Sequence, residues 1–178
     1  RSGEIWKEKS QSKRAALIEG ILSDFPKMKK AQRTNLLNDL VYAYTAAKEY
    51  DKAQKAILKL DKPTGSMYNE LAWPLIEKGE QLEKAVSWSG KSVELSRNSD
   101  MSSKPSYMSV ARWKENNNYE LGMFLDTYGF GAMKLGKNAE AAKSFAEAFQ
   151  SMKGGDADVN ARYMESLVKT SDVQKAVE

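Results

Sequence analysis

A short phrase that recurs three times carries the residues most capable of chemistry in this chain. It reads NDLVY at residues 38–42, NELAW at residues 69–73 and DTYGF at residues 126–130. Each copy begins with a side-chain amide or carboxylate and ends one helical turn later with an aromatic ring, so both ends share one helix face. Rings beside hydrogen-bonding groups suit the binding of an extended or helical peptide. The candidate binding residues are therefore Asn38, Tyr42, Asn69, Trp73, Asp126 and Phe130.

Two residue types that dominate enzyme active sites are absent from the chain. Its 178 residues include no Cys and no His. Disulfide and dithiol chemistry, the usual metal ligands and the usual proton shuttle near neutral pH are therefore excluded. We expect no catalytic residue, no metal site and no cofactor in this chain. Paired carboxylates or a lysine of perturbed pKa leave one alternative open, a stand-alone all-helical hydrolase that uses carboxylates.

The charged residues indicate solvated helix faces. The chain has 28 Lys and Arg residues and 24 Asp and Glu residues, which gives a net charge of +4. Basic and acidic residues are mixed along the sequence, as in EYDKAQKAILKLDK. Phosphate binding favours an uninterrupted basic stripe instead. No apolar run approaches the ~20 residues that cross a bilayer. We expect a protein or peptide partner, with no nucleic acid and no membrane insertion.

Helix hairpins must position the repeated phrase. Each copy is followed by a turn and then by an alanine, at Ala53, Ala85 and Ala141, that opens a second apolar helix. The same pattern, a phrase followed by a turn and an alanine, occurs a fourth time in a weaker form from Ala161 to Ala176. Units of about 34 residues are typical of helix-turn-helix repeats, and a long insertion separates the second unit from the third.

The apolar spacing predicts an all-α fold with no β-sheet. Hairpins are expected at about residues 35–60, 66–96, 121–152 and 158 onward, with a helix at about 12–24 that covers the first hairpin. Gly79 and Gly136 suit helix C-termini that need a positive φ. Pro74 predicts a kink or a restart of its helix.

The insertion, residues 97–120, is expected to be part loop and part helix. Ser-rich composition around Lys104 and Pro105 predicts the loop. A helix is expected to start at Ser106, and Trp113 would dock it onto the repeats.

The stretch LDTYGFGAMKLGKNAEAAKSFAEAF resembles the tetratricopeptide repeat. Gly129 stands where that motif has a small residue, Gly136 stands at its turn, and Ala141, Phe145 and Ala148 form its small-aromatic-small face. The resemblance implies a solenoid of helix hairpins wound into a right-handed superhelix, in which the first helices line a concave groove. The six candidate residues would line that groove.

This resemblance also implies a domain organisation. An N-terminal helix in residues 1–34 would pack on an array of repeats in residues 35–178. The last repeat would be truncated, because its second helix has barely begun at Glu178.

Two interpretations of the groove stay open. In one it holds a polypeptide segment, from another protein or from an adjacent domain of the same chain. In the other, the inserted segment or the N-terminal helix fills it, and the aromatic residues are ordinary core. Tetratricopeptide domains that bind the acidic tails of chaperones carry Lys and Arg on these faces. This chain carries Asn, Asp, Glu and aromatic residues there, so we do not expect a carboxylate clamp.

The run KPSYMSVARWKENNNYELGMFLDTYGFGAMKLGKN is similar to a segment in thioredoxin-family proteins from the cell envelope of Bacteroidetes-type bacteria. It has their Lys-Pro pair, a Ser at a helix start, a Trp and then DTY in the same order. The resemblance implies a periplasmic or cell-envelope location, although this chain has no targeting segment, and a cysteine-bearing thioredoxin domain beyond Glu178. We expect a non-catalytic interaction or scaffolding module of a larger thiol-disulfide oxidoreductase.

Overall fold

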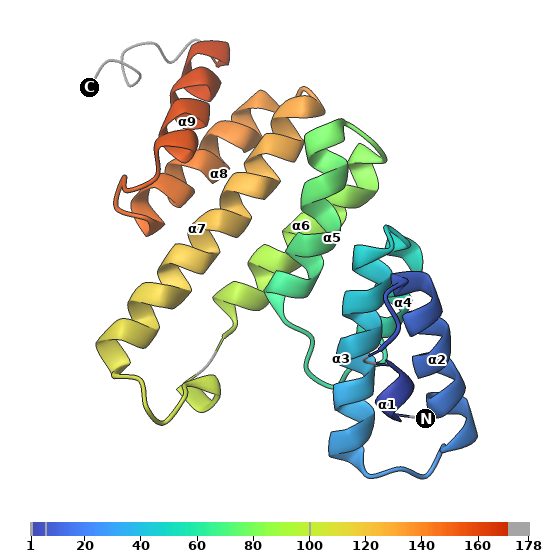
Figure 1. Cartoon of the computed structure of the whole chain (residues 1–178). Coiled ribbons are helices and arrows are strands. Elements are labelled where there is room, and N and C mark those ends of the chain that lie inside the picture. The colour runs from blue at the N-terminus through green and yellow to red at the C-terminus, as the bar shows by residue number, and fades with distance from the viewer. Residues whose placement is uncertain (1, 6, 100, 171–178) are drawn as a thin grey trace. The chain divides into compact units, whose positions relative to one another are not determined.

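The regular secondary structure in the described part of the chain is all helical. The computed structural model describes residues 2–5, 7–99 and 101–170 (Figure 1). Over these residues it contains eight α-helices of eight residues or more, one four-residue helix, one 3₁₀ turn and no strand. The predicted all-α fold is therefore confirmed, and consecutive helices pack as hairpins.

Internal contacts divide the chain into two compact units, Arg1–Pro63 and Thr64–Glu178. Each unit has its own buried residues and is described by itself. The predicted division into residues 1–34 and 35–178 stays a prediction.

The first unit contains α1 (Ser2–Ile5), α2 (Gln11–Asp24), α3 (Lys30–Ala46) and α4 (Tyr50–Ile57). α2 confirms the predicted helix at about 12–24, and it packs on α3, which in turn packs on α4. The Ser10 hydroxyl caps α2 by accepting a hydrogen bond from the Lys13 N–H. α3 starts at Lys30, earlier than the predicted residue 35, because residues 30–34 are adequate helix formers although they carry no apolar stripe.

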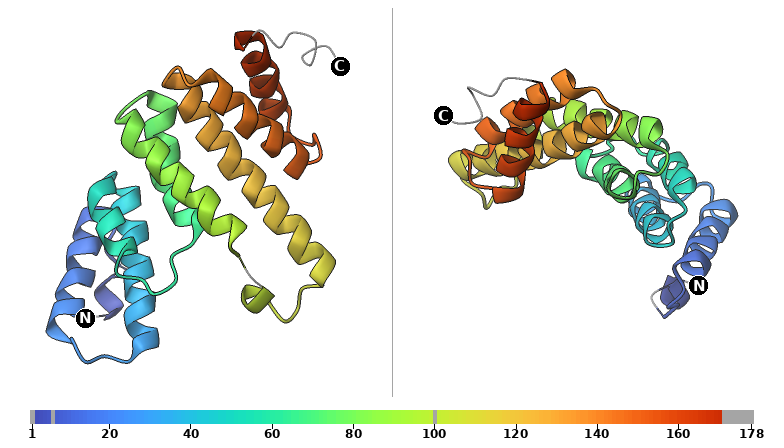
Figure 2. Two further views of the ribbon diagram at one scale, coloured as in Figure 1. Left: turned by 180° about the vertical axis from the view of Figure 1, so that it is seen from behind. Right: turned by 90° about the horizontal axis from the view of Figure 1, so that it is seen from above.

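The second unit contains α5 (Gly65–Lys78), α6 (Leu82–Arg97), α7 (Val110–Lys134), α8 (Asn138–Ser151) and α9 (Ala157–Lys169). Each of these helices packs on the next, and α7 also contacts α5 and α9 (Figure 2). Gly79 ends α5 with a φ of +75°, and Gly136 follows α7 with a φ of +76°, as predicted. The second helix predicted for the fourth sequence repeat, at and around Ala176, falls on residues 171–178, which lie outside the described residues.

The inserted segment is part loop and part helix, as predicted. A 3₁₀ turn at Met101–Ser103 precedes a loop in which the Lys104 Nζ donates hydrogen bonds to the carbonyls of Pro105 and Met108, at 3.0 and 2.6 Å. α7 begins after Ser109, not at Ser106, because the Ser109 hydroxyl accepts the N-cap hydrogen bond. The docking role predicted for Trp113, which is half-buried, stays a prediction.

α5 runs through Pro74 as one helix, so of the two outcomes predicted at this residue the restart does not occur, and the kink stays a prediction. A proline in a helix interior costs about 3 kcal/mol. The flanking residues Leu71, Ala72, Leu75 and Ile76 are each at most 2% exposed. Burial of four apolar side chains outweighs the local cost, because each larger side chain contributes about 1.5–3 kcal/mol.

Small residues bring α7 close to α8. A Cβ atom added to Gly129 would lie 2.9 Å from Cε1 of Phe145, whose ring is fully buried on α8. Ala141 and Ala148, one turn to either side of Phe145, are also fully buried. The small-aromatic-small pattern of the sequence therefore packs a ring of one helix against the bare backbone of the other.

Replacing Gly129 by Ala should destabilise the second unit. Alanine favours a helix over glycine by about 1 kcal/mol, but the added methyl group requires the buried Phe145 ring to move, and overpacking costs about 1–3 kcal/mol. We expect a net loss of about 1 kcal/mol in urea unfolding. G20A is the matched control, because Gly20 lies exposed in α2 with no atom within 4 Å of an added Cβ; it should be neutral or stabilising. A stabilised G129A variant would contradict the close packing.

Candidate functional site

The six predicted binding residues fall into both units. Asn38 and Tyr42 lie on α3 of the first unit, where Asn38 is exposed and Tyr42 is 60% exposed. The other four lie on α5 and α7 of the second unit, at Asn69, Trp73, Asp126 and Phe130. Since the site is built within one unit, its geometry is given by these four residues and their neighbours.

Trp73 and Phe130 are brought together across the contact of α5 with α7. Their ring centroids lie 6.1 Å apart, and the ring planes are tilted by 35°. Both side chains are half-buried, so each ring keeps part of its surface in solvent. Gly131 permits this approach, because a Cβ atom there would lie 2.5 Å from Cγ2 of Val86 and 3.0 Å from Cδ1 of Ile76.

Arg162 of α9 completes the cluster, and it was missed in the sequence. Its Cζ lies 5.0 Å from the centroid of Phe130 and 5.7 Å from that of Trp73, within the range of a cation–π contact. Its Nη1 donates a hydrogen bond to Oδ2 of Asp126. We call Trp73, Phe130, Arg162 and Asp126 the aromatic–arginine cluster. The only available signal was a basic residue inside the weak fourth copy, and its distance in sequence from Asp126 hid the pairing.

A second cation lies against the same ring. The Lys134 Nζ is 4.7 Å from the Phe130 centroid, and it donates a hydrogen bond of 2.7 Å to the carbonyl of Glu77. This bond ties the end of α7 to α5. Basic side chains therefore reach the Phe130 ring from the last turn of α7 and from α9, at positions other than those compared in the sequence, and the expected absence of a carboxylate clamp stays a prediction.

Asp126 is almost fully buried, at 7% exposed. Its Oδ2 is paired with Arg162, whereas its Oδ1 is buried with no hydrogen-bond partner among the described residues. Burial raises the pKa of this carboxyl to about 6; the charge of Arg162 opposes the rise, and the charges of Asp156 and Asp158 add to it. Only one oxygen of this carboxylate has a hydrogen-bond partner, so its interactions in the protein replace little of the hydration that burial removes. Desolvation therefore raises the pKa of Asp126 by more than Arg162 lowers it.

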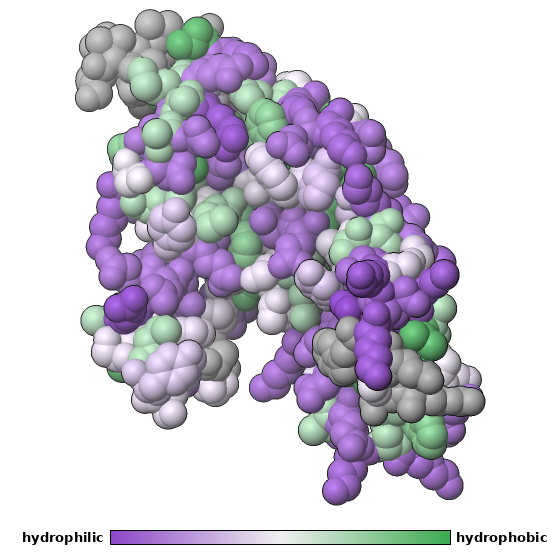
Figure 3. Space-filling view, viewed as in Figure 1, coloured by the Kyte–Doolittle hydropathy of each residue, from purple (hydrophilic) through white to green (hydrophobic). Residues whose placement is uncertain are grey.

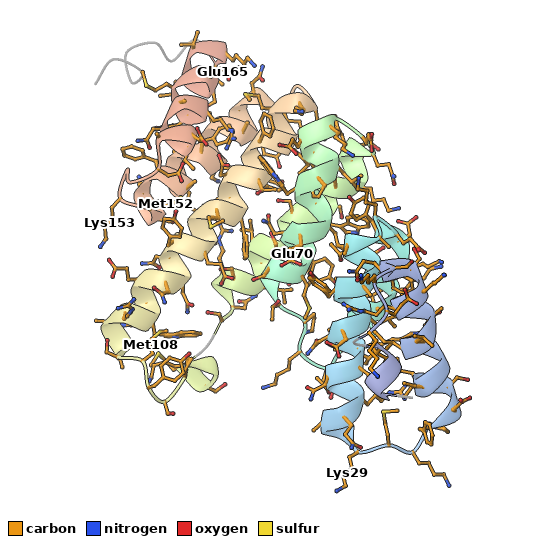
Figure 4. All side chains as sticks on the ribbon, viewed as in Figure 1. Lys29, Glu70, Met108, Met152, Lys153 and Glu165 are labelled. Carbon is orange, nitrogen blue, oxygen red and sulfur yellow. The ribbon has the colours of Figure 1, made fainter. Side chains whose placement is uncertain are left out.

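Asn69 stands one turn before Trp73, as Asp126 stands one turn before Phe130. Its Oδ1 is also buried and lacks a hydrogen-bond partner among the described residues. A buried acceptor without a hydrogen-bond partner lowers the stability of the folded state by about 1–3 kcal/mol. Glu70, the next residue of α5, is exposed (Figure 4).

In the described ranges, no group of three or more Asp and Glu residues is placed to hold a metal ion. No helix between residues 2 and 170, the masked positions aside, is long and apolar enough to cross a membrane. The visible molecular face is mostly hydrophilic, with small scattered apolar areas (Figure 3).

No family model matches the chain, and no curated protein sequence matches it either.

The raised pKa of Asp126 predicts how stability depends on pH. The folded state binds the proton more tightly than the unfolded chain, whose carboxyl has a pKa near 3.8. The contribution of this group therefore grows as the pH falls below about 6 and is lost as the pH rises through 6. From pH 7 to pH 5 the free energy of unfolding should gain about 1 kcal/mol from Asp126.

D126N isolates this effect from the other carboxyl groups. Urea unfolding at several pH values should show a smaller gain toward pH 5 for D126N than for the wild type. D61N is the control, because Asp61 is exposed and paired with Lys30, which lowers its pKa. Equal pH profiles for wild type and D126N would contradict the assignment.

Proposed function

We propose that this chain is a non-catalytic protein-interaction module that holds a polypeptide segment on the aromatic–arginine cluster of its second unit. The observation that carries the proposal is the contact of the half-buried Trp73 and Phe130 rings under the Arg162 guanidinium. Tryptophan and arginine are the residues most often found where binding energy concentrates in protein interfaces.

The cluster offers a peptide both apolar surface and hydrogen-bond donors. An arginine has five N–H donors in a fixed plane, and Arg162 uses Nη1 toward Asp126 and makes no other hydrogen bond with the described residues. The remaining donors suit the carbonyl groups of a peptide backbone, and an apolar side chain of the peptide would cover Trp73 and Phe130. The ion pair with Asp126 holds the guanidinium in place before binding, which lowers the entropy cost of association.

A finer fold is part of the proposal. The consecutive hairpins, the positive-φ glycines at Gly79 and Gly136 and the packing of Gly129 against Phe145 agree with the tetratricopeptide pattern. We propose that the repeats form a right-handed solenoid, with the face of α5, α7 and α9 as its concave side.

The parent protein is proposed to be a larger bacterial thioredoxin-like oxidoreductase of the cell envelope. The resemblance of the segment from Lys104 to Asn138 supports this assignment, and the bound segment would then come from a partner or from the adjacent domain. The gene sequence beyond Glu178 tests it: a CxxC motif in a strand-helix context is expected, and a further run of helical repeats without cysteine would contradict it.

The rival proposal is an all-helical hydrolase, and one observation favours it. Asp126 has a pKa near 6, which suits a general acid. Its free oxygen is buried, however, and the other oxygen is bonded to Arg162. A substrate would have to displace the guanidinium before it reached the carboxyl, so we rank this function second.

Replacing Trp73 by Ala tests the binding proposal. A peptide selected from a random display library against the wild-type protein should bind W73A at least about tenfold more weakly, a loss of about 1.4 kcal/mol. Because Trp73 is only half-buried, W73A should lower the free energy of unfolding by less than the ~3–5 kcal/mol that replacing a fully buried tryptophan by alanine costs.

Y107A is the matched control for this experiment. Tyr107 is an aromatic residue of the same unit that is 87% exposed and lies in the loop before α7. Its removal should leave peptide affinity unchanged. The proposal fails at this site if W73A retains full affinity, or if the variant loses its fold.

A further inference from the structure

Described residues of the first unit surround a cavity of about 790 Å³. Five of the lining residues, 24 to 28, belong to the end of α2 and the α2–α3 loop, the loop that leads to Lys29 in Figure 4. Cavities of about 300–1,000 Å³ are the usual size of small-molecule sites. The described residues that line it lie between Ile5 and Asp39, so it is independent of the aromatic–arginine cluster and of the function proposed for that cluster.

Most of the wall is apolar. It is formed by Ile5 at the end of α1, by Ile21 near the end of α2, by the loop residues Phe25, Pro26 and Met28, and by Leu36 on α3. Phe25 is 54% exposed, which is unusual for a large ring in a small helical unit. This wall offers a ligand a large apolar contact.

A polar stripe on α3 also lines the cavity. Gln32, Asn35 and Asp39 all line the cavity, and their spacing of three and four residues places them on one helix face. The residues that pack α3 into the core belong to a different face, which includes Leu37, Leu40, Val41 and Tyr44. The stripe is therefore not needed for the packing of the helix.

Asp39 is the charged group of this stripe. It is half-buried, and it forms no direct hydrogen bond or ion pair with residues in the described part of the chain. Burial raises its pKa, and the charge of Arg14 on α2 only partly opposes the rise. The lining also carries Asp24 and Lys27.

We propose that this cavity binds a small amphiphilic cation, in which an apolar body fills the wall formed around Phe25 and Leu36 and one ammonium group pairs with Asp39. The size of the cavity, its apolar lining and the carboxylate of Asp39, whose charge Arg14 only partly offsets, all select this ligand chemistry. A neutral molecule would fill the wall but leave the carboxylate unpaired, and an anion would be repelled by it.

Three matched probes test the proposal: protonated 4-phenylbutylamine, 4-phenylbutan-1-ol and 4-phenylbutyrate. They share one apolar body and differ only in the charge of the end group. Titrations of the whole chain followed by amide NMR shifts should place the amine among residues of α2 and α3 that line the cavity. The amine should bind roughly tenfold more tightly than the alcohol, the equivalent of about 1.4 kcal/mol, and the butyrate should bind most weakly.

D39N should remove the preference for the amine over the alcohol while both still bind. D61N is the control, because it removes one carboxylate from the same unit at an exposed position outside the cavity; it should leave the preference intact. Circular dichroism confirms that each variant is folded. Equal binding of amine and alcohol to the wild type, shifts that fall outside the cavity, or no binding of the amine up to its solubility limit would each overturn the proposal.

Discussion

The second unit depends on the close approach of α7 to its neighbours, which glycine permits at three positions. A Cβ atom at Gly122 would lie 2.3 Å from Cγ of Met152, one at Gly129 2.9 Å from Phe145, and one at Gly131 2.5 Å from Val86. Met152 lies at the end of α8 (Figure 4). α7 therefore packs through bare backbone against α6 on one side and α8 on the other, at distances that any side chain would increase.

The position of Phe130 follows from this constraint. It stands between Gly129, which faces α8, and Gly131, which faces α5 and α6, so its side chain projects toward the remaining face, where Trp73 and Arg162 lie. The same packing buries Asp126 one turn earlier and raises its pKa, and Arg162 is the group that compensates it. The close packing of α7 through its glycines therefore determines the contact between Trp73 and Phe130 and the burial of Asp126 beside Arg162.

Much of the fold is encoded locally and was predicted for that reason. Helix periodicity, the positive φ of Gly79 and Gly136 and the small-aromatic-small face around Phe145 each depend on residues within a few positions of one another. What was missed depends on tertiary contacts. Burial of the residues beside Pro74 keeps α5 continuous, and Arg162 reaches Asp126 from 36 positions away. The cavity of the first unit is also non-local, because α1, α2 and α3 each supply part of its wall.

The central claim is that Trp73 and Arg162 act together on a bound peptide, and a double-mutant cycle tests it most directly. W73A, R162Q and the double variant, each checked for fold by circular dichroism, are titrated with a peptide selected on the wild-type protein. Because the guanidinium and the ring are in contact, we predict a coupling free energy of about 1 kcal/mol or more in binding. Additive effects, within about 0.3–0.5 kcal/mol, would contradict the account.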